Sequence, residues 1–346
     1  MQLHHPDSQK NQYVESLRGL AILLVVLFHA LQGLPRNVYT LLNQDLFIYL
    51  SESFAYVRMP LFTVISGYVY SMRPVREGLG KLFLQKKSKR ILLPFVVATA
   101  LTLLARLILP TKYPLDIGVA EFAKYFLVGF EHLWYLPTIF YIFCITVLLE
   151  KVPFAKTGKG FALLLCFVIA ISGLIKSTIP FHVLQKTPLL NIAYLLPYFV
   201  WGIGIYRFFW HKSNLICMAA AAVALVGLVV QQFALFEVIT APAGRRSALA
   251  LLTGFSITLL MFRYPPNNYV LIYFSKYAFT IYLYHFFGIS GGKLLLRFMD
   301  VGSPLMILIA STAVGLALPI ALQELAGRWR IARVLVGMRV KPKEES

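Results

Sequence analysis

The chain has 346 residues, of which 59% are hydrophobic, and it carries 33 Lys and Arg residues against 14 Asp and Glu, a formal net charge of +19. Soluble domains are about 45–50% apolar, so the composition argues against a soluble protein and indicates a polytopic membrane protein. The basic residues cluster between apolar runs, which the positive-inside rule explains without a nucleic-acid partner.

Ten apolar segments predict an all-α fold, a polytopic transmembrane helical bundle. Each segment is close to the roughly twenty residues that cross about 30 Å of hydrocarbon. In chain order the segments cover residues 14–34, 45–72, 91–110, 122–150, 160–176, 189–209, 215–236, 246–263, 269–292 and 303–323. The first part of the second segment is amphipathic, and we expect it to lie at the external face of the membrane before the chain turns inward.

The charge pattern predicts the orientation of this bundle. Residues 75–90 carry a dense basic block, and the tail after residue 327 is also basic. An even number of spans places both termini on one side, and most Lys and Arg residues then face the cytoplasm if the N-terminus does. We therefore expect residues 1–346 to form one membrane-embedded domain, N-in and C-in, with cytoplasmic tails at 1–12 and 328–346.

The first apolar segment carries two polar side chains, Arg18 and His29, which lie eleven residues apart. At about 100° and 1.5 Å per residue, they share nearly one helix face and are separated by about 16 Å along the axis. Arg18 either pairs with Glu15 and reaches toward the interface or binds a cytosolic anion. An anion held by Arg18 could extend along this face toward His29, and coenzyme A has such a shape.

Five sequence motifs, taken together, resemble the acyltransferase-3 family of integral membrane acyltransferases. Arg18-Gly19-Leu20 followed by His29 resembles the Arg-x10-His signature of the family. The other matches are RMPLFTVISGYVYS at 58–71, FLQKKSKRILLPF at 83–95, HLWYLPTIFYIF at 132–143 and YAFTIYLYHFF at 277–287. These motifs occur in the family's order and extend over nearly the whole chain.

This resemblance implies an enzyme of the bacterial cytoplasmic (inner) membrane that transfers an acyl group. In this family the group is most often acetyl, taken from acetyl-CoA and moved to a hydroxyl of a carbohydrate. Typical acceptors are surface or exported polysaccharides, such as exopolysaccharide or O-antigen, and their lipid-linked precursors. The chain departs from the family's basic motif at Lys87, where arginine is usual. Lysine provides a point charge for phosphate without the bidentate guanidinium.

With this resemblance, His29 is the candidate catalytic residue. A neutral imidazole, with a pKa near 6.5, can remove the proton of an attacking hydroxyl at physiological pH. A transient acyl-histidine is the alternative. Arg18, Lys87 and Arg90 are the candidate residues for binding the phosphates of acetyl-CoA. Their alternative role is the ordinary positive-inside charge of the membrane protein.

Further polar residues are candidates for the acceptor site or for the cavity that holds it. Arg58 either pairs with Glu52 or Glu131 or contacts an anionic acceptor. His132 and Trp134 lie at the entry to a middle helix, where Trp134 is an interfacial aromatic or a stacking surface for a sugar. Tyr282 and His285 are three residues apart on one helix surface, either as a core hydrogen-bonding pair or across from His29.

The sequence also limits the competing interpretations. No HExxH motif, carboxylate cluster or pair of histidines at ligand spacing is present, so we expect no metal cofactor. A transporter or flippase of a lipid-linked sugar would also accommodate buried charges, and the same type of enzyme could use succinyl or another acyl donor. Finally, we expect the small pair Ser66 and Gly67 to allow close helix packing.

Overall fold

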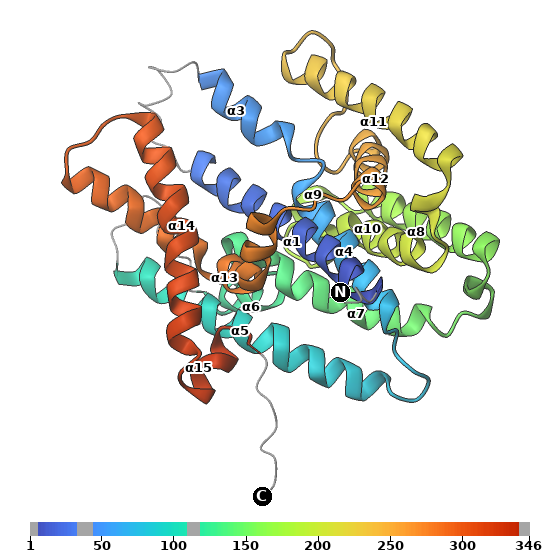
Figure 1. Ribbon diagram of the computed structural model, residues 1–346, viewed down its shortest axis with the longest axis horizontal. Helices are drawn as coiled ribbons and strands as arrows, with labels where there is room; N and C mark the ends of the chain where they lie inside the picture. The colour runs from blue at the N-terminus through green and yellow to red at the C-terminus, as the bar shows by residue number, and fades with distance from the viewer. Residues whose placement is uncertain (1–5, 33–43, 109–117, 339–346) are drawn as a thin grey trace, which may run out of the picture. The chain divides into compact units, whose positions relative to one another are not determined.

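The computed structural model describes residues 6–32, 44–108 and 118–338 (Figure 1). Within these ranges every regular element is a helix. The predicted all-α, polytopic helical fold is therefore confirmed. The outer parts of the two predicted cytoplasmic tails, residues 1–5 and 339–346, lie outside the described residues.

The chain divides into two compact units. The first comprises Met1–Met72 and Tyr198–Ile320, and the second comprises Arg73–Pro197 and Ala321–Ser346. The first unit contains α1 (Pro6–Gln32), α3 (Gln44–Ser53), α4 (Arg58–Met72), η3 (Trp210–Lys212), α11 (Asn214–Leu235), α12 (Ala248–Arg263) and α13 (Tyr269–Phe298). The second contains α5 (Gly80–Ile108), α6 (Val119–Leu127), η1 (Glu131–Trp134), α7 (Tyr135–Leu149), η2 (Pro153–Lys156), α8 (Gly158–Thr178), α9 (Phe181–Leu184) and α15 (Arg330–Leu335). Two helices contribute to both units, α10 (Leu189–Arg207) and α14 (Pro304–Ala326).

Seven helical segments of the described chain are long and apolar enough to cross a membrane. They are Gln12–Gln32, Gly80–Ile108, Glu131–Leu149, Gly158–Thr178, Leu189–Arg207, Asn214–Leu235 and Pro304–Ala326. Each overlaps one of the ten predicted segments. The other three predicted segments correspond to α3 with α4, to the shorter apolar helix α12 and to α13. The count of ten spans and the N-in, C-in orientation stay predictions.

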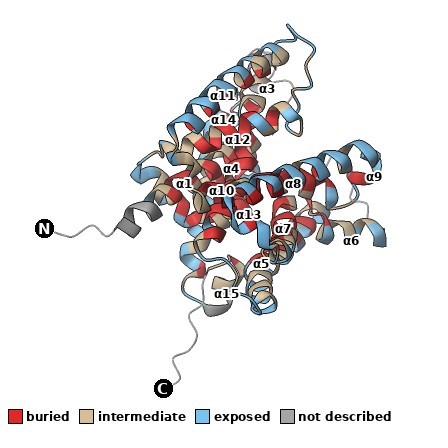
Figure 2. Ribbon diagram, turned by 90° about the vertical axis from the view of Figure 1, so that its right-hand side faces the viewer, coloured by how far each residue is buried: buried red, intermediate tan, exposed pale blue. Residues whose placement is uncertain are grey.

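The distribution of burial fits helices that are solvated by lipid. On α11 the side chains of Leu215, Met218, Leu225 and Val226 are between 61% and 78% exposed, and Figure 2 shows long exposed stretches on this helix. By contrast, 72% of the most apolar window of α10 is buried, against 28% for α11. Such large apolar surfaces would be unfavourable in water but are compatible with hydrocarbon.

The prediction of one continuous span over 122–150 is wrong. The helix α6 ends at Leu127, and the chain turns through Gly129, whose φ is +104°. A Cβ at this position would lie 2.3 Å from the Cα of Trp134, so the turn requires glycine. An ion pair between Arg106 and Glu131 connects α5 to the short helix η1 that follows the turn.

The segment predicted at 91–110 belongs to a longer helix, and the structure corrects its start. The helix α5 begins at Gly80 and continues to Ile108. Lys87 and Arg90 therefore lie inside α5. Lysine, arginine, glutamine and leucine are all good helix formers, so the charged segment extends the apolar span without a break.

Glycine permits a very close approach of α4 and α10. A Cβ at Gly67 would lie 2.0 Å from the carbonyl oxygen of Phe199, and a Cβ at Gly202 would lie 2.1 Å from that of Val64. The two glycines thus provide matching gaps for the opposite backbone, as in other membrane helix pairs with small residues at their interface. The expected close packing at Gly67 is confirmed.

We expect Gly67→Ala to lower the thermal unfolding temperature of the detergent-solubilised protein. The added methyl group forces the helices apart, and overpacking of this kind costs about 1–3 kcal/mol. Gly173→Ala is the matched control, because a Cβ at this helical glycine of α8 meets nothing within 4 Å. Equal effects of the two substitutions would show that the α4–α10 contact does not require glycine.

Candidate active site

The helix α1 carries both Arg18 and His29 and is uninterrupted from Pro6 to Gln32. The two residues therefore keep the helical spacing that the sequence predicts, about three turns and about 16 Å along the axis. Both side chains are intermediate in exposure. A single rigid element thus fixes the distance between a cation and a titratable imidazole.

The helix α13 packs along α1, and the two run side by side in Figure 1, α1 in blue and α13 in orange. At Gly19 the contact is so close that a Cβ would lie 1.9 Å from the carbonyl oxygen of Leu271. Near one end of the same interface, Ser16 and Asn268 also lie within 3.5 Å of each other, Oγ to backbone. This packing sets which residues of α13 face α1.

His285 of α13 lies beside His29. The centroids of the two imidazole rings are 5.1 Å apart and the rings are tilted by 43°. His285 has no exposed surface, whereas His29 is half-buried. The ring of Tyr282 lies 6.3 Å from that of His285. Two titratable side chains that are far apart in the sequence, His29 and His285, thus lie side by side in the structure.

Hydrogen bonding defines the protonation pattern of His285. Its Nδ1 lies 2.9 Å from the carbonyl oxygen of Ile281 and 3.0 Å from that of Tyr282. Carbonyl oxygens only accept hydrogen bonds, so Nδ1 carries the proton. In the neutral ring Nε2 then has a lone pair, and His285 presents a basic nitrogen instead of a second N–H donor.

Arg58 places a cation against the ring of Phe28, whose centroid lies 4.9 Å from that of His29. The residue is 4% exposed at the start of α4, and its Cζ lies 3.2 Å from the centroid of the Phe28 ring. Its Nη1 also donates a hydrogen bond to the carbonyl oxygen of Ser51, at 3.3 Å. Since Phe28 precedes His29 in α1, Arg58 can add positive potential near the histidines. Glu131, one partner considered for Arg58, pairs with Arg106 instead.

Arg18 is part of a second polar cluster on the same helix interface. Its Nη1 lies 2.7 Å from both carboxylate oxygens of Glu15, and Ser275 of α13 donates a hydrogen bond of 2.6 Å to Oε2 of Glu15. The pairing of Arg18 with Glu15, one of its two predicted roles, is therefore present. Because the side chains of both partners remain about one third exposed, an anion can still approach the guanidinium.

Lys87 and Arg90, the other candidate donor-binding residues, belong to the second unit. The Nζ of Lys87 lies 4.0 Å from the ring centroid of Phe143 and 5.4 Å from that of Phe83, a cation–π arrangement between α5 and α7. Arg90 is exposed. Lys87 thus contributes to the packing of α5 against α7, which is a structural role that the sequence did not indicate.

His132 and Trp134 lie in η1, also in the second unit. His132 is 4% exposed, and Trp134 is half-buried with its ring edge-to-face against Tyr135. Its carbonyl oxygen accepts a hydrogen bond of 2.7 Å from Thr138. These contacts hold η1 at the beginning of α7, as the motif at 132–143 predicts for the entry to a helix.

The α1–α13 interface of the first unit therefore holds two polar clusters, His29 with His285 and Tyr282, and Arg18 with Glu15 and Ser275. The sequence analysis missed Ser275, which holds Glu15 from the opposite helix. No sequence signal marks this serine, because its contact depends on the register between α1 and α13. The contact between Phe28 and Arg58 was also not predicted, since an aromatic residue inside an apolar run gives no sequence signal.

Comparison with known proteins gives one positive result. The acyltransferase-3 family model, described as an acyltransferase domain, matches residues 11–324. This range includes every candidate residue discussed above. Searches of curated proteins and of solved structures returned no match.

We expect Arg58→Met to lower the stability of the protein by about 2 kcal/mol, the value for a desolvated cation–π contact. Methionine keeps an unbranched stem but removes the guanidinium from Phe28 and Ser51. Arg297→Met, at an exposed position of α13, is the control. Thermal unfolding in detergent compares the two, and unfolding at the same temperature would contradict a stabilising role for Arg58.

Proposed function

The chain belongs to the acyltransferase-3 family and is a membrane acyltransferase; from this premise we propose that it transfers an acetyl group from acetyl-CoA to a hydroxyl of a carbohydrate. The proposed acceptors are surface or exported polysaccharides or their lipid-linked precursors, and the proposed location is the bacterial inner membrane. The observation that carries the proposal is the pair of imidazoles, His29 and His285, 5.1 Å apart between α1 and α13.

In the proposed reaction His29 acts as the general base. Its neutral imidazole removes the proton of the acceptor hydroxyl as the oxygen attacks the thioester carbonyl carbon. The new C–O bond forms, the C–S bond breaks, and the imidazolium returns the proton to the departing thiolate of coenzyme A. No net charge is left on the protein, and His29 is regenerated for the next cycle.

His285 is the proposed positioning residue for His29. Its Nδ1 is fixed by two backbone carbonyls, so its Nε2 offers a fixed hydrogen-bond acceptor beside the second imidazole. An acceptor at this place would favour the tautomer of His29 whose N–H faces His285 and whose other nitrogen carries the lone pair that acts as the base.

Arg18 is the proposed contact for the phosphates of acetyl-CoA, with Lys87 and Arg90 as further proposed contacts. A phosphate would share the guanidinium with Glu15, which now occupies it. The distance of about 16 Å between Arg18 and His29 along α1 suits a donor bound by its nucleotide with a slender thioester arm. The surrounding apolar helices would exclude water and so limit thioester hydrolysis.

The acceptor would reach the thioester beside Tyr282 and Arg58, from the external side or from within the membrane. His132 and Trp134 are proposed acceptor contacts, with Trp134 as a stacking surface for a sugar ring. Family membership favours this enzyme over a transporter of lipid-linked sugars. Succinyl or another acyl group remains the alternative donor, and mass spectrometry of the modified glycan distinguishes the acyl groups.

We expect His29→Ala to reduce acetyl transfer at least about a hundredfold, the lower end of the contribution of a general base. Transfer of radiolabelled acetyl from acetyl-CoA is measured in membranes that contain equal amounts of the variant and the original protein. His182→Ala, at an exposed position of α9, is the control and should retain activity. Full activity of His29→Ala would remove this residue from the mechanism.

For Arg18→Ala we expect the KM for acetyl-CoA to rise about tenfold, because a hydrogen bond to a charged group contributes about 1.5–3 kcal/mol. The kcat should change less, since Arg18 is three turns from the reacting atoms. Steady-state kinetics with varied acetyl-CoA separates the two parameters. An unchanged KM with a lower unfolding temperature would show that Arg18 serves the fold through Glu15.

A further inference from the structure

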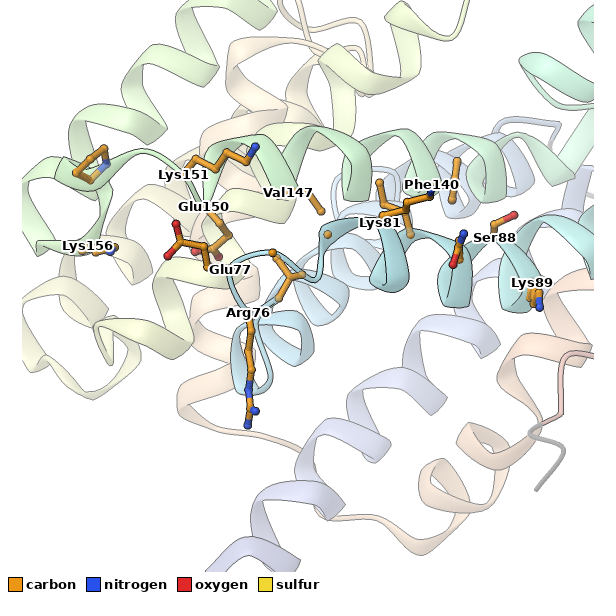
Figure 3. Close-up of a pocket in the computed structure, with 16 residues that line it drawn as sticks. Arg76, Glu77, Lys81, Ser88, Lys89, Phe140, Val147, Glu150, Lys151 and Lys156 are labelled. Atoms are coloured by element: carbon orange, nitrogen blue, oxygen red, sulfur yellow. The ribbon is translucent and has the colours of Figure 1, made fainter. Parts of the chain in front are cut away.

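A basic cavity of about 1530 Å³ lies in the second unit, where the loop before α5 meets the end of α7 (Figure 3). Five basic side chains line it, and Figure 3 shows them arranged around the space between the two helices. They are Arg76, Lys81, Lys89, Lys151 and Lys156. We refer to this space, with these residues, as the basic cavity.

The basic cavity has more positive than negative side chains. Glu77 and Glu150 also line the cavity, so two negative charges face five positive ones and an excess of three positive charges remains. The lysines at 81, 89, 151 and 156 are all exposed to solvent. Positive charge concentrated in a concave surface attracts anions more strongly than the same charge spread over a convex one.

The backbone at the edge of the cavity also suits an anion. The loop contains Gly78, with φ of +76°, and Gly80 is the first residue of α5; both line the cavity. A Cβ at Gly78 would meet nothing within 4 Å, so its backbone is open to a ligand. A glycine-rich loop followed by the N-terminus of a long helix presents backbone N–H groups and a positive dipole end.

We propose that the basic cavity binds an anion that carries more than one phosphate group. A single phosphate monoester carries about 1.5–2 negative charges at pH 7, less than the excess of three. The volume also exceeds the roughly 300–1,000 Å³ of common small-molecule pockets, so a single inorganic phosphate would leave it largely empty. The ligand is either a soluble nucleotide such as coenzyme A or an anionic membrane lipid, since α5 and α7 are both candidate membrane spans.

The lining of the basic cavity includes Lys89 but not Lys87 or Arg90, the donor contacts proposed on α5. Lys81 and Arg90 are nine residues apart, which at about 100° per residue places them on opposite sides of the helix. Lys87 stacks against Phe143 and Phe83 and does not line the cavity. The proposal therefore concerns residues to which the proposed transfer reaction assigns no contact, and with coenzyme A as the ligand it rests on that proposed function.

Binding of pyrophosphate to the purified protein in phosphatidylcholine nanodiscs, followed by calorimetry, tests the proposal. We expect the double variant Lys81→Gln/Lys151→Gln to bind pyrophosphate at least about tenfold more weakly than the original protein. The control is Lys86→Gln/Lys159→Gln, which removes the same charge at exposed positions outside the cavity and should change the affinity less than about threefold. Absence of pyrophosphate binding, or equal weakening in the two double variants, would overturn the proposal.

Competition then identifies the source of the phosphates. Displacement of pyrophosphate by coenzyme A assigns the cavity to a soluble nucleotide, and displacement on adding cardiolipin, which carries two phosphates, to the nanodiscs assigns it to a lipid headgroup. Both results retain the proposal. Because binding is measured without acyl transfer, an inactive His29→Ala protein should show the same affinity, which separates this site from the proposed reaction.

Discussion

The close packing of α1 against α13 is the constraint on which the candidate active site depends. Gly19 lets the backbone of α1 approach the carbonyl of Leu271, and this contact sets the register between the two helices. A slip by one turn, about 5.4 Å, would exceed the 5.1 Å that now separates the rings of His29 and His285. The same register joins Ser275 to Glu15, so one helix contact positions both polar clusters of the first unit.

Polar side chains inside a membrane bundle are costly unless other groups bind them. Arg58 is buried but has an aromatic ring and a backbone carbonyl as partners, and Nδ1 of His285 has two carbonyls. Local contacts therefore bind the guanidinium of Arg58 and Nδ1 of His285. His29 itself stays half-buried. The proposed reaction needs this balance, because its site would exclude bulk water and still admit a thioester and a hydroxyl.

Hydropathy predicted the helices well and their boundaries less well. The break at Gly129 was missed because its immediate neighbours, Val128 and Phe130, are apolar, and hydropathy does not report the left-handed backbone of a single glycine. The predicted start of α5, at residue 91, was too late. Charged residues indicate where a chain leaves the membrane, but the helix itself can continue beyond that point. For the site, helical spacing predicted the relation of Arg18 to His29, but the contact of His29 with His285 depends on tertiary packing that spacing alone does not contain.

The most direct test of the central claim is an electron cryo-microscopy map of the protein with a non-hydrolysable analogue of acetyl-CoA. The account predicts that the nucleotide lies beside Arg18 and that the carbon replacing the thioester carbonyl lies within about 3.5 Å of the ring of His29, close to the separation of reacting atoms. A map with the analogue bound away from α1, and with His29 and His285 facing lipid, would contradict it.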